Sequence, residues 1–245
     1  MNRDQILKTR ANRKTRLARP FDNFYESIQQ CITGASALLK GEVSPQFSLL
    51  LERSIVITAV TAIEVYYRDM LDAIFRHCTE EFLEPKLKHL HSEKYDIIDI
   101  LDIYRHRIHP VELITSNQSF QNAERIDKVF SNFTSGNFWK IVLNLHVSLD
   151  PDFKPENIHV LKDDDLIGLQ NIFKLRHELV HDPARKAFFT YEVLQNLEKS
   201  QAIVWVSDLV LVQVIESNKR TDFKNQKEDK IETDAITPGT SNHSG

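Results

Sequence analysis

The sequence has few glycines and lacks a glycine-rich phosphate loop. Only six of the 245 residues are glycine, and neither a GxGxxG nor a GxxxxGK pattern occurs. Such loops bind nucleotide phosphates because their glycines let backbone amides approach the phosphate oxygens. The sequence therefore gives no support for nucleotide binding by a loop of either kind. Because only eight prolines are present to interrupt helices, long helices are expected.

Cysteine is equally scarce. Cys31 and Cys78 are the only two, and neither belongs to a CxxC pair. This argues against both a disulfide framework and a zinc cluster built from cysteines. We therefore expect a reducing, cytoplasmic location for the chain.

Long apolar runs are also missing. The N-terminus has no apolar core of the kind found in signal peptides. The most apolar stretch, residues 202–215, contains Asp208 and Gln213. It is also shorter than the about 20 residues that a membrane-spanning helix needs. We expect no association with a membrane.

Basic residues are concentrated at the N-terminus. Residues 1–20 contain seven Lys or Arg residues and one acidic residue, Asp4, so this N-terminal arm carries +6 and the remainder −10. A basic arm of this kind either attracts a polyanion such as RNA or is simply solvated. Solvation is the commoner state of a chain end.

Apolar residues recur at three- and four-residue steps along most of the chain, which is the pattern of amphipathic helices. This pattern predicts an all-α fold, a helical bundle with long core helices. The expected helices are 21–39, 46 to about 82, one within 85–110, 122–133, 163–181 and 191–217. The predicted organisation is the arm at 1–20, one helical domain at 21–217 and a disordered polar tail at 218–245. Between 105 and 160 the pattern is irregular, apart from a loop at 150–157.

The longest helical run, 46–82, carries one apolar stripe and is expected to be the central core helix. The stripe consists of Ile55, Ala59, Ile63, Tyr66, Met70 and Ile74. Glu64 and Arg68 stand four residues apart, so that they can pair across one helical turn. They either form a solvated salt bridge or line the edge of an active-site cleft.

The densest group of chemically capable side chains is LRHELVHDP, residues 175–183. Its helix begins at Asp163–Asp165, whose short acidic side chains suit a helix N-terminus and need no metal ion there. Pro183 forces Asp182 out of helical geometry, so His181 is expected in the last turn. Two interpretations compete for these residues.

The first interpretation is a zinc site. His177, Glu178 and His181 form HExxH, the zinc-binding signature of many metalloproteases. Such a helix must continue beyond the second His and meet a third ligand downstream. Here the helix is expected to end at His181, and the candidate third ligands, Glu192 and Glu198, lie in a helix without a ligand signature. The zinc interpretation is therefore the weaker one.

The second interpretation is metal-free cleavage of RNA. That reaction needs a group that moves a proton from the 2′-hydroxyl or to the leaving 5′-oxygen, and a cation that stabilises the phosphorane-like transition state. His181 and Arg176 suit these roles, because His titrates near neutral pH and Arg presents a planar fork of donors. Five residues apart, they point about 140° from each other, which favours a site shared across a two-fold axis. His177 is expected near the same cleft.

The run Arg176-His177-Glu178-Leu179-Val180-His181 resembles the signature of HEPN domains. In that signature an Arg is followed directly by a polar residue and, a few residues later, by a His near the end of a late helix. The helix containing residues 61–70 also looks like the early core helix of the RiboL-PSP-HEPN branch. The resemblance implies a dimerising helical bundle and a metal-independent endoribonuclease without a cofactor. It further implies a role in toxin–antitoxin, abortive-infection or other anti-phage systems.

By this resemblance Arg176 and His181 are the expected catalytic residues, and His177 is the polar residue that follows the Arg. The auxiliary candidates for the cleft are Glu178, Asp182, Glu64 and Arg68. The predicted function is cleavage of tRNA or mRNA by a homodimer with a composite active site, with an antitoxin or defence-system protein as a further partner. The alternatives are a non-catalytic HEPN-like module that binds RNA or an antitoxin, and the zinc metallopeptidase.

Overall fold

The structure, a computed structural model, describes most of the helical part of the chain. It describes residues 3–13, 16, 18–87, 97–108, 112–113, 115, 118–148, 158–182 and 189–220. The elements are, in chain order, α1 (Arg3–Arg13), α2 (Pro20–Leu39), α3 (Pro45–His77), α4 (Glu80–Leu87), α5 (Ile97–Arg105), α7 (Ala123–Phe130), α8 (Phe138–Asn144), β1 (His146–Ser148), β2 (Ile158–Val160), α9 (Asp163–His181) and α10 (Tyr191–Ser217). The predicted all-α fold is confirmed.

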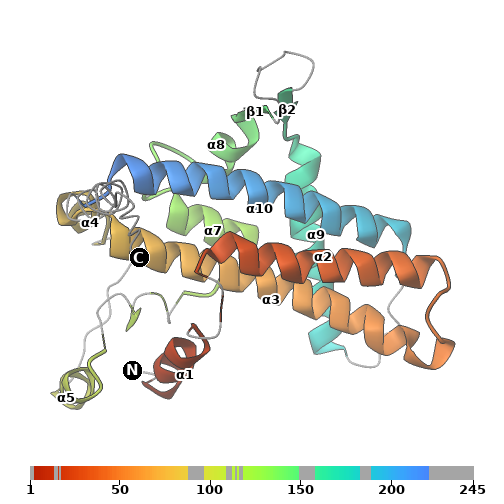
Figure 1. Ribbon diagram of the computed structural model, residues 1–245, viewed down its shortest axis with the longest axis horizontal. Helices are drawn as coiled ribbons and strands as arrows, with labels where there is room; N and C mark the ends of the chain where they lie inside the picture. Colours follow the sequence, from red (N-terminus) through yellow and green to blue (C-terminus); the bar gives the residue numbers. More distant parts are fainter. Residues whose placement is uncertain are drawn as a thin grey trace, which may run out of the picture.

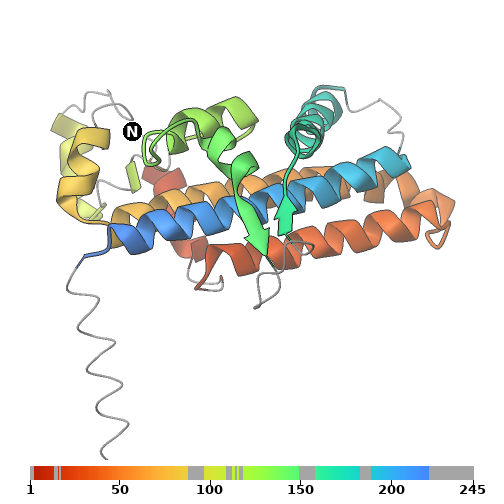
Figure 2. The same cartoon turned by 90° about the horizontal axis from the view of Figure 1, so that it is seen from above.

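Three long helices form the centre of the molecule. α3 and α10 lie side by side, and α2 packs against both (Figure 1). α7, α8 and α9 cover the opposite face of this pair, as Figure 2 shows. α9 runs across the long helices and contacts both α10 and α3. This crossing brings the end of α9, where the motif lies, to the central helix α3.

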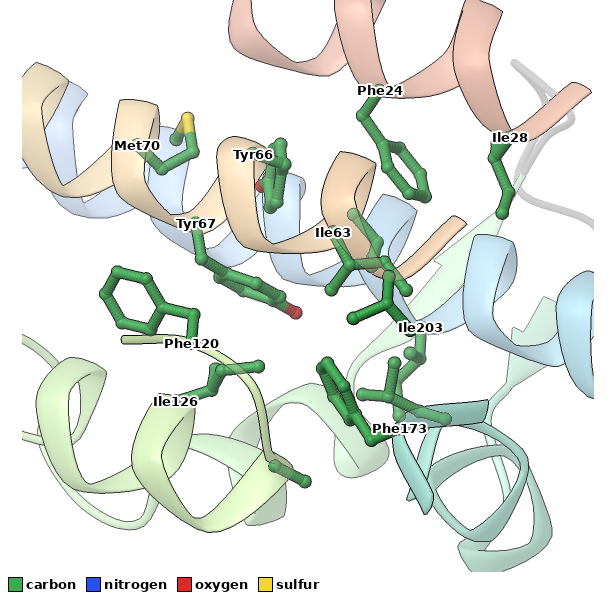
Figure 3. Packing of buried hydrophobic residues seen from close by; sticks show 14 of the residues in the cluster. Phe24, Ile28, Ile63, Tyr66, Tyr67, Met70, Phe120, Ile126, Phe173 and Ile203 are labelled. Atoms are coloured by element: carbon green, nitrogen blue, oxygen red, sulfur yellow. The ribbon is translucent and has the colours of Figure 1, made fainter. Parts of the chain in front are cut away.

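The hydrophobic core is organised around α3. All six residues of the predicted stripe are buried. Tyr66 packs toward Phe24 of α2, with ring centroids 5.7 Å apart, and Tyr67 toward Phe130 of α7 at 5.5 Å. Figure 3 shows these side chains leaving α3 toward the two outer layers. Because each buried aromatic ring favours the folded state by about 1.5–3 kcal/mol, α3 holds both layers in place.

Two tyrosine hydroxyl groups inside this core are satisfied by α10. The Tyr66 hydroxyl donates to Asp208 Oδ1 at 3.2 Å, and the Tyr67 hydroxyl donates to Ser207 Oγ at 3.0 Å. Arg19 donates to the other carboxylate oxygen of Asp208 at 3.1 Å. Burial raises the pKa of Asp208, and the Arg19 guanidinium opposes that rise. These bonds fix how α10 lies along α3.

The central helix is shorter than predicted, because it ends at His77 rather than near Phe82. Cys78 is extended and forms an isolated antiparallel bridge with Lys219. The Thr79 hydroxyl then accepts from the amide of Phe82 at 3.4 Å, as a Thr does when it caps a new helix. Since the apolar pattern continues across this break, the pattern alone did not indicate it.

The prediction of a disordered tail from Asn218 onward is wrong for residues 218–220, which have backbone contacts with residues 77–79. Arg220 donates from its amide to the His77 carbonyl and from Nε to the Cys78 carbonyl, both at 2.9 Å. These bonds satisfy carbonyl groups that the end of α3 leaves open. Residues 221–245, the rest of the predicted tail, lie outside the described residues.

Two segments, α5 and the pair of strands β1 and β2, differ from what the pattern of apolar residues predicts. α5 has the periodicity of a core helix, yet its Ile98 and Tyr104 are 67% and 83% exposed, and it lies with α1 apart from the long helices (Figure 1). β1 and β2 form an antiparallel pair, with His146 opposite Val160, which no pattern indicated. The predicted loop at 150–157 lies outside the described residues.

The N-terminal arm is attached to the rest of the protein. Residues 3–13 form α1, whose Ile6 is buried together with Ile108 and Leu113. Three arginines of the arm form ion pairs with carboxylates elsewhere in the chain: Arg10 with Glu112, Arg16 with Asp69, and Arg19 with Asp208. The arm is therefore neither a fully solvated end nor wholly available to a polyanion, and both interpretations of its charge need this correction.

Within the described residues, α10 is long and apolar enough to cross a membrane by length and composition. Core helices of soluble proteins pass the same test, so this observation is weak evidence. Here α10 packs against α2, α3, α8 and α9, and its buried Asp208 is paired with Arg19. Much of its apolar surface is therefore covered by other helices.

The close crossing of α9 and α10 depends on Gly168. A Cβ atom at this position would lie 2.8 Å from Lys199 Cβ. Overpacking of this kind costs about 1–3 kcal/mol, and the better helix propensity of Ala offsets about 1 kcal/mol. We therefore expect Gly168→Ala to lower the free energy of unfolding by about 1 kcal/mol in urea denaturation. Gly136→Ala is the matched control, because a Cβ there meets nothing within 4 Å; equal losses in both variants would contradict the close crossing.

Candidate active site

The motif lies at the C-terminal end of α9. Leu179 is buried and anchors this end in the core. α9 ends at His181 as predicted, and the amide of Asp182 donates to the Glu178 carbonyl at 2.9 Å. Asp182 itself has φ −124° and ψ 83°, because helical geometry is disfavoured for the residue before Pro183. The proline therefore fixes where the helix presents His181.

The opposite end of α9 is capped by one of its own aspartates. The Asp165 carboxylate accepts from the Lys162 amide at 2.8 Å, while the Asp165 amide donates to the Lys162 carbonyl at 2.9 Å. Asp164 forms an ion pair with Lys199 of α10. The predicted capping role is confirmed for Asp165, and Asp164 ties α9 to its neighbour.

The two histidines of the motif lie together on the exposed side of this helix end. The ring centroids of His177 and His181 are 4.3 Å apart, with the rings tilted by 52°. Both side chains are exposed, and so is Val180 between them in the sequence. A ligand can therefore reach both imidazoles from solvent.

Arg176 lies on a different side of α9, half-buried, where it interacts with Glu64 of α3. Burial raises the pKa of Glu64, and the charges of Arg176 and Arg68, together with a hydrogen bond with Gln121, oppose that rise. Arg176 is the cation with the larger effect on this carboxyl group. Glu64 of α3 therefore lies near enough to Arg176 for their charges to interact.

Arg68 lies one turn further along α3 and is also half-buried. Its Nε atom is buried and has no hydrogen-bond partner within the described residues. We call Arg176, Glu64, Arg68 and Gln121 the polar cluster. The cluster lies where α3 meets α9, so Glu64 and Arg68 are not simply a solvated pair on one helix, and their place at a cleft edge stays a prediction. No sequence pattern indicated Gln121 or the interaction between Glu64 and Arg176.

A family model, RiboL-PSP-HEPN, matches residues 23–233 of the chain. The match includes α3 and α9 and begins after the N-terminal arm. The chain belongs to the RiboL-PSP-HEPN family. No curated protein and no solved structure matches it. The family membership supports a HEPN-type ribonuclease or an RNA-related module.

In this HEPN chain the motif residues are divided between two sides of α9. Arg176 and His181 leave the helix in directions about 140° apart, and the first is half-buried whereas the second is exposed. The remaining auxiliary candidates, Glu178 and Asp182, are half-buried and exposed respectively, and each has polar interactions of its own. One chain thus presents the two principal motif residues on separate surfaces.

The alternative of a zinc site in this HEPN chain lacks a third ligand in the described part of the sequence. No group of three or more His, Cys, Asp and Glu side chains there is arranged to hold a metal ion. Glu192 and Glu198, the candidates from the sequence, are both exposed on α10. With α9 ending at His181, the described residues supply no third ligand for the HExxH interpretation.

The raised pKa of Glu64 predicts a pH dependence of stability. Because the folded pKa lies above the unfolded one, the folded HEPN chain binds more protons between these two values. The stabilisation is complete below the unfolded pKa and is lost as the pH rises through the folded pKa. We therefore expect Glu64→Gln, which does not titrate, to gain stability relative to the wild type between acid and neutral pH. Urea denaturation of both chains at an acid and at a neutral pH measures the difference in their free energies of unfolding. A difference that does not change with pH contradicts the prediction.

Proposed function

We propose that the chain is a metal-independent endoribonuclease of the HEPN type, with Arg176 and His181 as catalytic residues. The observation that carries this proposal is the presentation of the motif by α9 in a chain of this family. The helix ends at an exposed His181, while Arg176 lies half-buried on another side of α9, where its charge interacts with Glu64 of α3. A proton-transfer group and a cation are thus both anchored on rigid elements.

The reaction is attack of a ribose 2′-hydroxyl on the adjacent phosphorus. The new bond joins the 2′-oxygen to phosphorus, and the bond from phosphorus to the 5′-oxygen breaks. His181 moves a proton from the 2′-hydroxyl or to the leaving 5′-oxygen. Arg176 stabilises the negative charge that develops on the phosphorane-like transition state. His177, whose ring lies beside that of His181, contacts the same phosphate group.

The active site is composite, formed by two copies of the chain. Since Arg176 and His181 point about 140° apart on one helix, a single α9 does not direct both toward one phosphate. A two-fold axis beside α9 brings the Arg of one copy to the His of the other. The dimer is therefore required for cleavage.

A face of α3 next to the polar cluster suits this contact with a second copy. Leu50 is 66% exposed and Ile57 39% exposed along this face, and Val180 at the end of α9 is 46% exposed. Ser54 and Thr61 lie along the same face. Their hydroxyl groups donate to the carbonyl groups of Leu50 and Ile57 in their own helix. Exposed apolar side chains and hydroxyls that already donate within their own helix thus lie along this face, as in helix contacts between subunits.

The substrate is tRNA or mRNA in the cytoplasm, and the cleavage serves a toxin or anti-phage defence role in which an antitoxin or defence-system protein restrains or triggers the enzyme. The family membership supports the RNA-related part of this proposal.

A second candidate is a non-catalytic module that binds RNA or an antitoxin through the same residues. The interaction of Arg176 with Glu64 favours this candidate, because an Arg that already faces a carboxyl group is less able to stabilise the extra negative charge of a transition state.

Cleavage of labelled tRNA and mRNA in the presence of EDTA tests the proposal. We expect one product with a 2′,3′-cyclic phosphate or its hydrolysed form, and the other with a 5′-hydroxyl that accepts a phosphate from polynucleotide kinase without prior dephosphorylation. Products with a 5′-phosphate contradict the mechanism. RNA binding without cleavage supports the non-catalytic module instead.

A further inference from the structure

A cavity of about 710 Å³ lies between the N-terminal arm and the second half of α3. Arg16, Arg19 and Arg76 line it, together with Asp69 and Asp72. Its volume falls within the range of pockets that hold small ligands, about 300–1,000 Å³. The cavity is separate from the motif on α9, because none of its lining residues comes from that helix.

The three arginines are the exposed members of their ion pairs. Arg19 and Arg76 have side chains that are 59% and 55% exposed, whereas the carboxylates they pair with, Asp208 and Asp72, are 2% and 6% exposed. Arg16 is likewise more exposed than Asp69. The Asp208 carboxylate thus lies behind Arg19, whereas Asp69 and Asp72 line the cavity beside the more exposed guanidinium groups that pair with them.

Each guanidinium group also has donors beyond those used in its ion pair. Arg16 contacts Asp69 through Nη1, Arg19 contacts Asp208 through Nη2, and Arg76 contacts Asp72 through Nε. An Arg side chain carries five N–H donors. Each carboxylate therefore orients its guanidinium group by a close contact to one nitrogen, and the group carries further N–H donors that suit an anion.

We propose that this cavity binds the phosphate groups of a nucleotide, either a free nucleotide or one within an RNA strand. Arginine forks match phosphate oxygens in charge and geometry. Ala18, Pro20 and Ala73 supply an apolar wall, which suits a base or ribose. This binding uses arginine side chains and needs no glycine-rich loop. It goes beyond the proposed cleavage and does not depend on it.

The positively charged N-terminal arm forms one wall of the proposed binding site. Arg16, Ala18 and Arg19 belong to the arm, whereas Ala73 and Arg76 belong to α3. A nucleotide that bridges these two walls binds the arm to the central helix more firmly. The arm is then part of a binding site in addition to its internal ion pairs.

Calorimetric titration of the full chain tests this site with three probes: ATP, adenosine, and a 2′-O-methyl RNA oligonucleotide that cannot be cleaved. We expect ATP, the oligonucleotide or both to bind, and adenosine not to bind. Arg76→Gln should weaken binding by about tenfold or more, the effect of losing a charge-assisted contact. The affinity of Arg76→Lys should lie between those of the wild type and Arg76→Gln, because Lys keeps the positive charge but lacks the planar fork of donors.

Arg105→Gln provides the charge-matched control, since Arg105 is exposed on α5 and does not line the cavity. Because Arg76 is largely exposed, its variants should fold, which thermal unfolding verifies. Binding of ATP alone identifies a free nucleotide, and binding of the oligonucleotide alone identifies an RNA strand. The proposal is overturned if neither probe binds, if adenosine binds as well as ATP, or if Arg76→Gln and Arg105→Gln bind like the wild type. Calorimetry measures binding directly, so the result is independent of any cleavage.

Discussion

Replacement of His181 by Ala is expected to slow RNA cleavage by about 10²–10⁴-fold, the usual contribution of a general acid or base. His181 is the exposed last residue of α9, whereas the buried Leu179 anchors this end of the helix. The substitution therefore removes the imidazole without opening a cavity in the core. Thermal unfolding should change no more than for other surface substitutions. The initial rate of tRNA cleavage in EDTA measures the effect.

His159→Ala is the matched control for this experiment. His159 is exposed on β2, outside the motif, so the same change of side chain should leave the cleavage rate unaltered. His177→Ala is expected to give an intermediate loss, because its ring lies 4.3 Å from that of His181 but transfers no proton. A His181→Ala chain that cleaves as fast as the wild type contradicts the assignment of the catalytic His.

The periodicity of apolar residues was sufficient to predict the bounds of three of the four long helices. α2 and α10 agree closely with the predicted bounds, and α9 with both of its ends. This succeeded because each helix buries one continuous side, so that burial appears directly in the sequence. The end of α9 was predicted for a second reason, since Pro183 acts on its own neighbour and needs no tertiary contact.

Other features were not predictable, because they depend on residues distant in the sequence. The end of α3 at His77 is stabilised by Arg220, and Glu64 is held beside Arg176 by the crossing of α3 and α9. Neither neighbour leaves a local pattern. α5 shows the converse, since Ile98 and Tyr104 follow a helical period but are exposed. The periodicity of apolar residues predicts which side of a helix is apolar. It does not predict whether another element packs against that side.

Replacement of Arg176 by Ala is expected to reduce cleavage by about 10²–10³-fold, as loss of one donor to a developing oxyanion does. Glu64 then loses the cation with the larger effect on its pKa, so that its pKa should rise further. Lys174→Ala removes a positive charge from the exposed side of the same helix and controls for the loss of general attraction to RNA. If both variants lose activity equally, Arg176 acts through net charge and has no role at the phosphate.

If the active site is composite, mixing two inactive variants should restore part of the activity. In a mixed dimer of Arg176→Ala and His181→Ala chains, one site lacks both residues and the other has both intact. Half of the dimers in an equal mixture are mixed, so the mixture should regain about one quarter of the wild-type rate, although each variant alone is inactive. A site built within one chain gives no recovery in this experiment. Recovery of cleavage on mixing, measured after the dimers have exchanged subunits, therefore distinguishes a shared catalytic cleft from two independent ones.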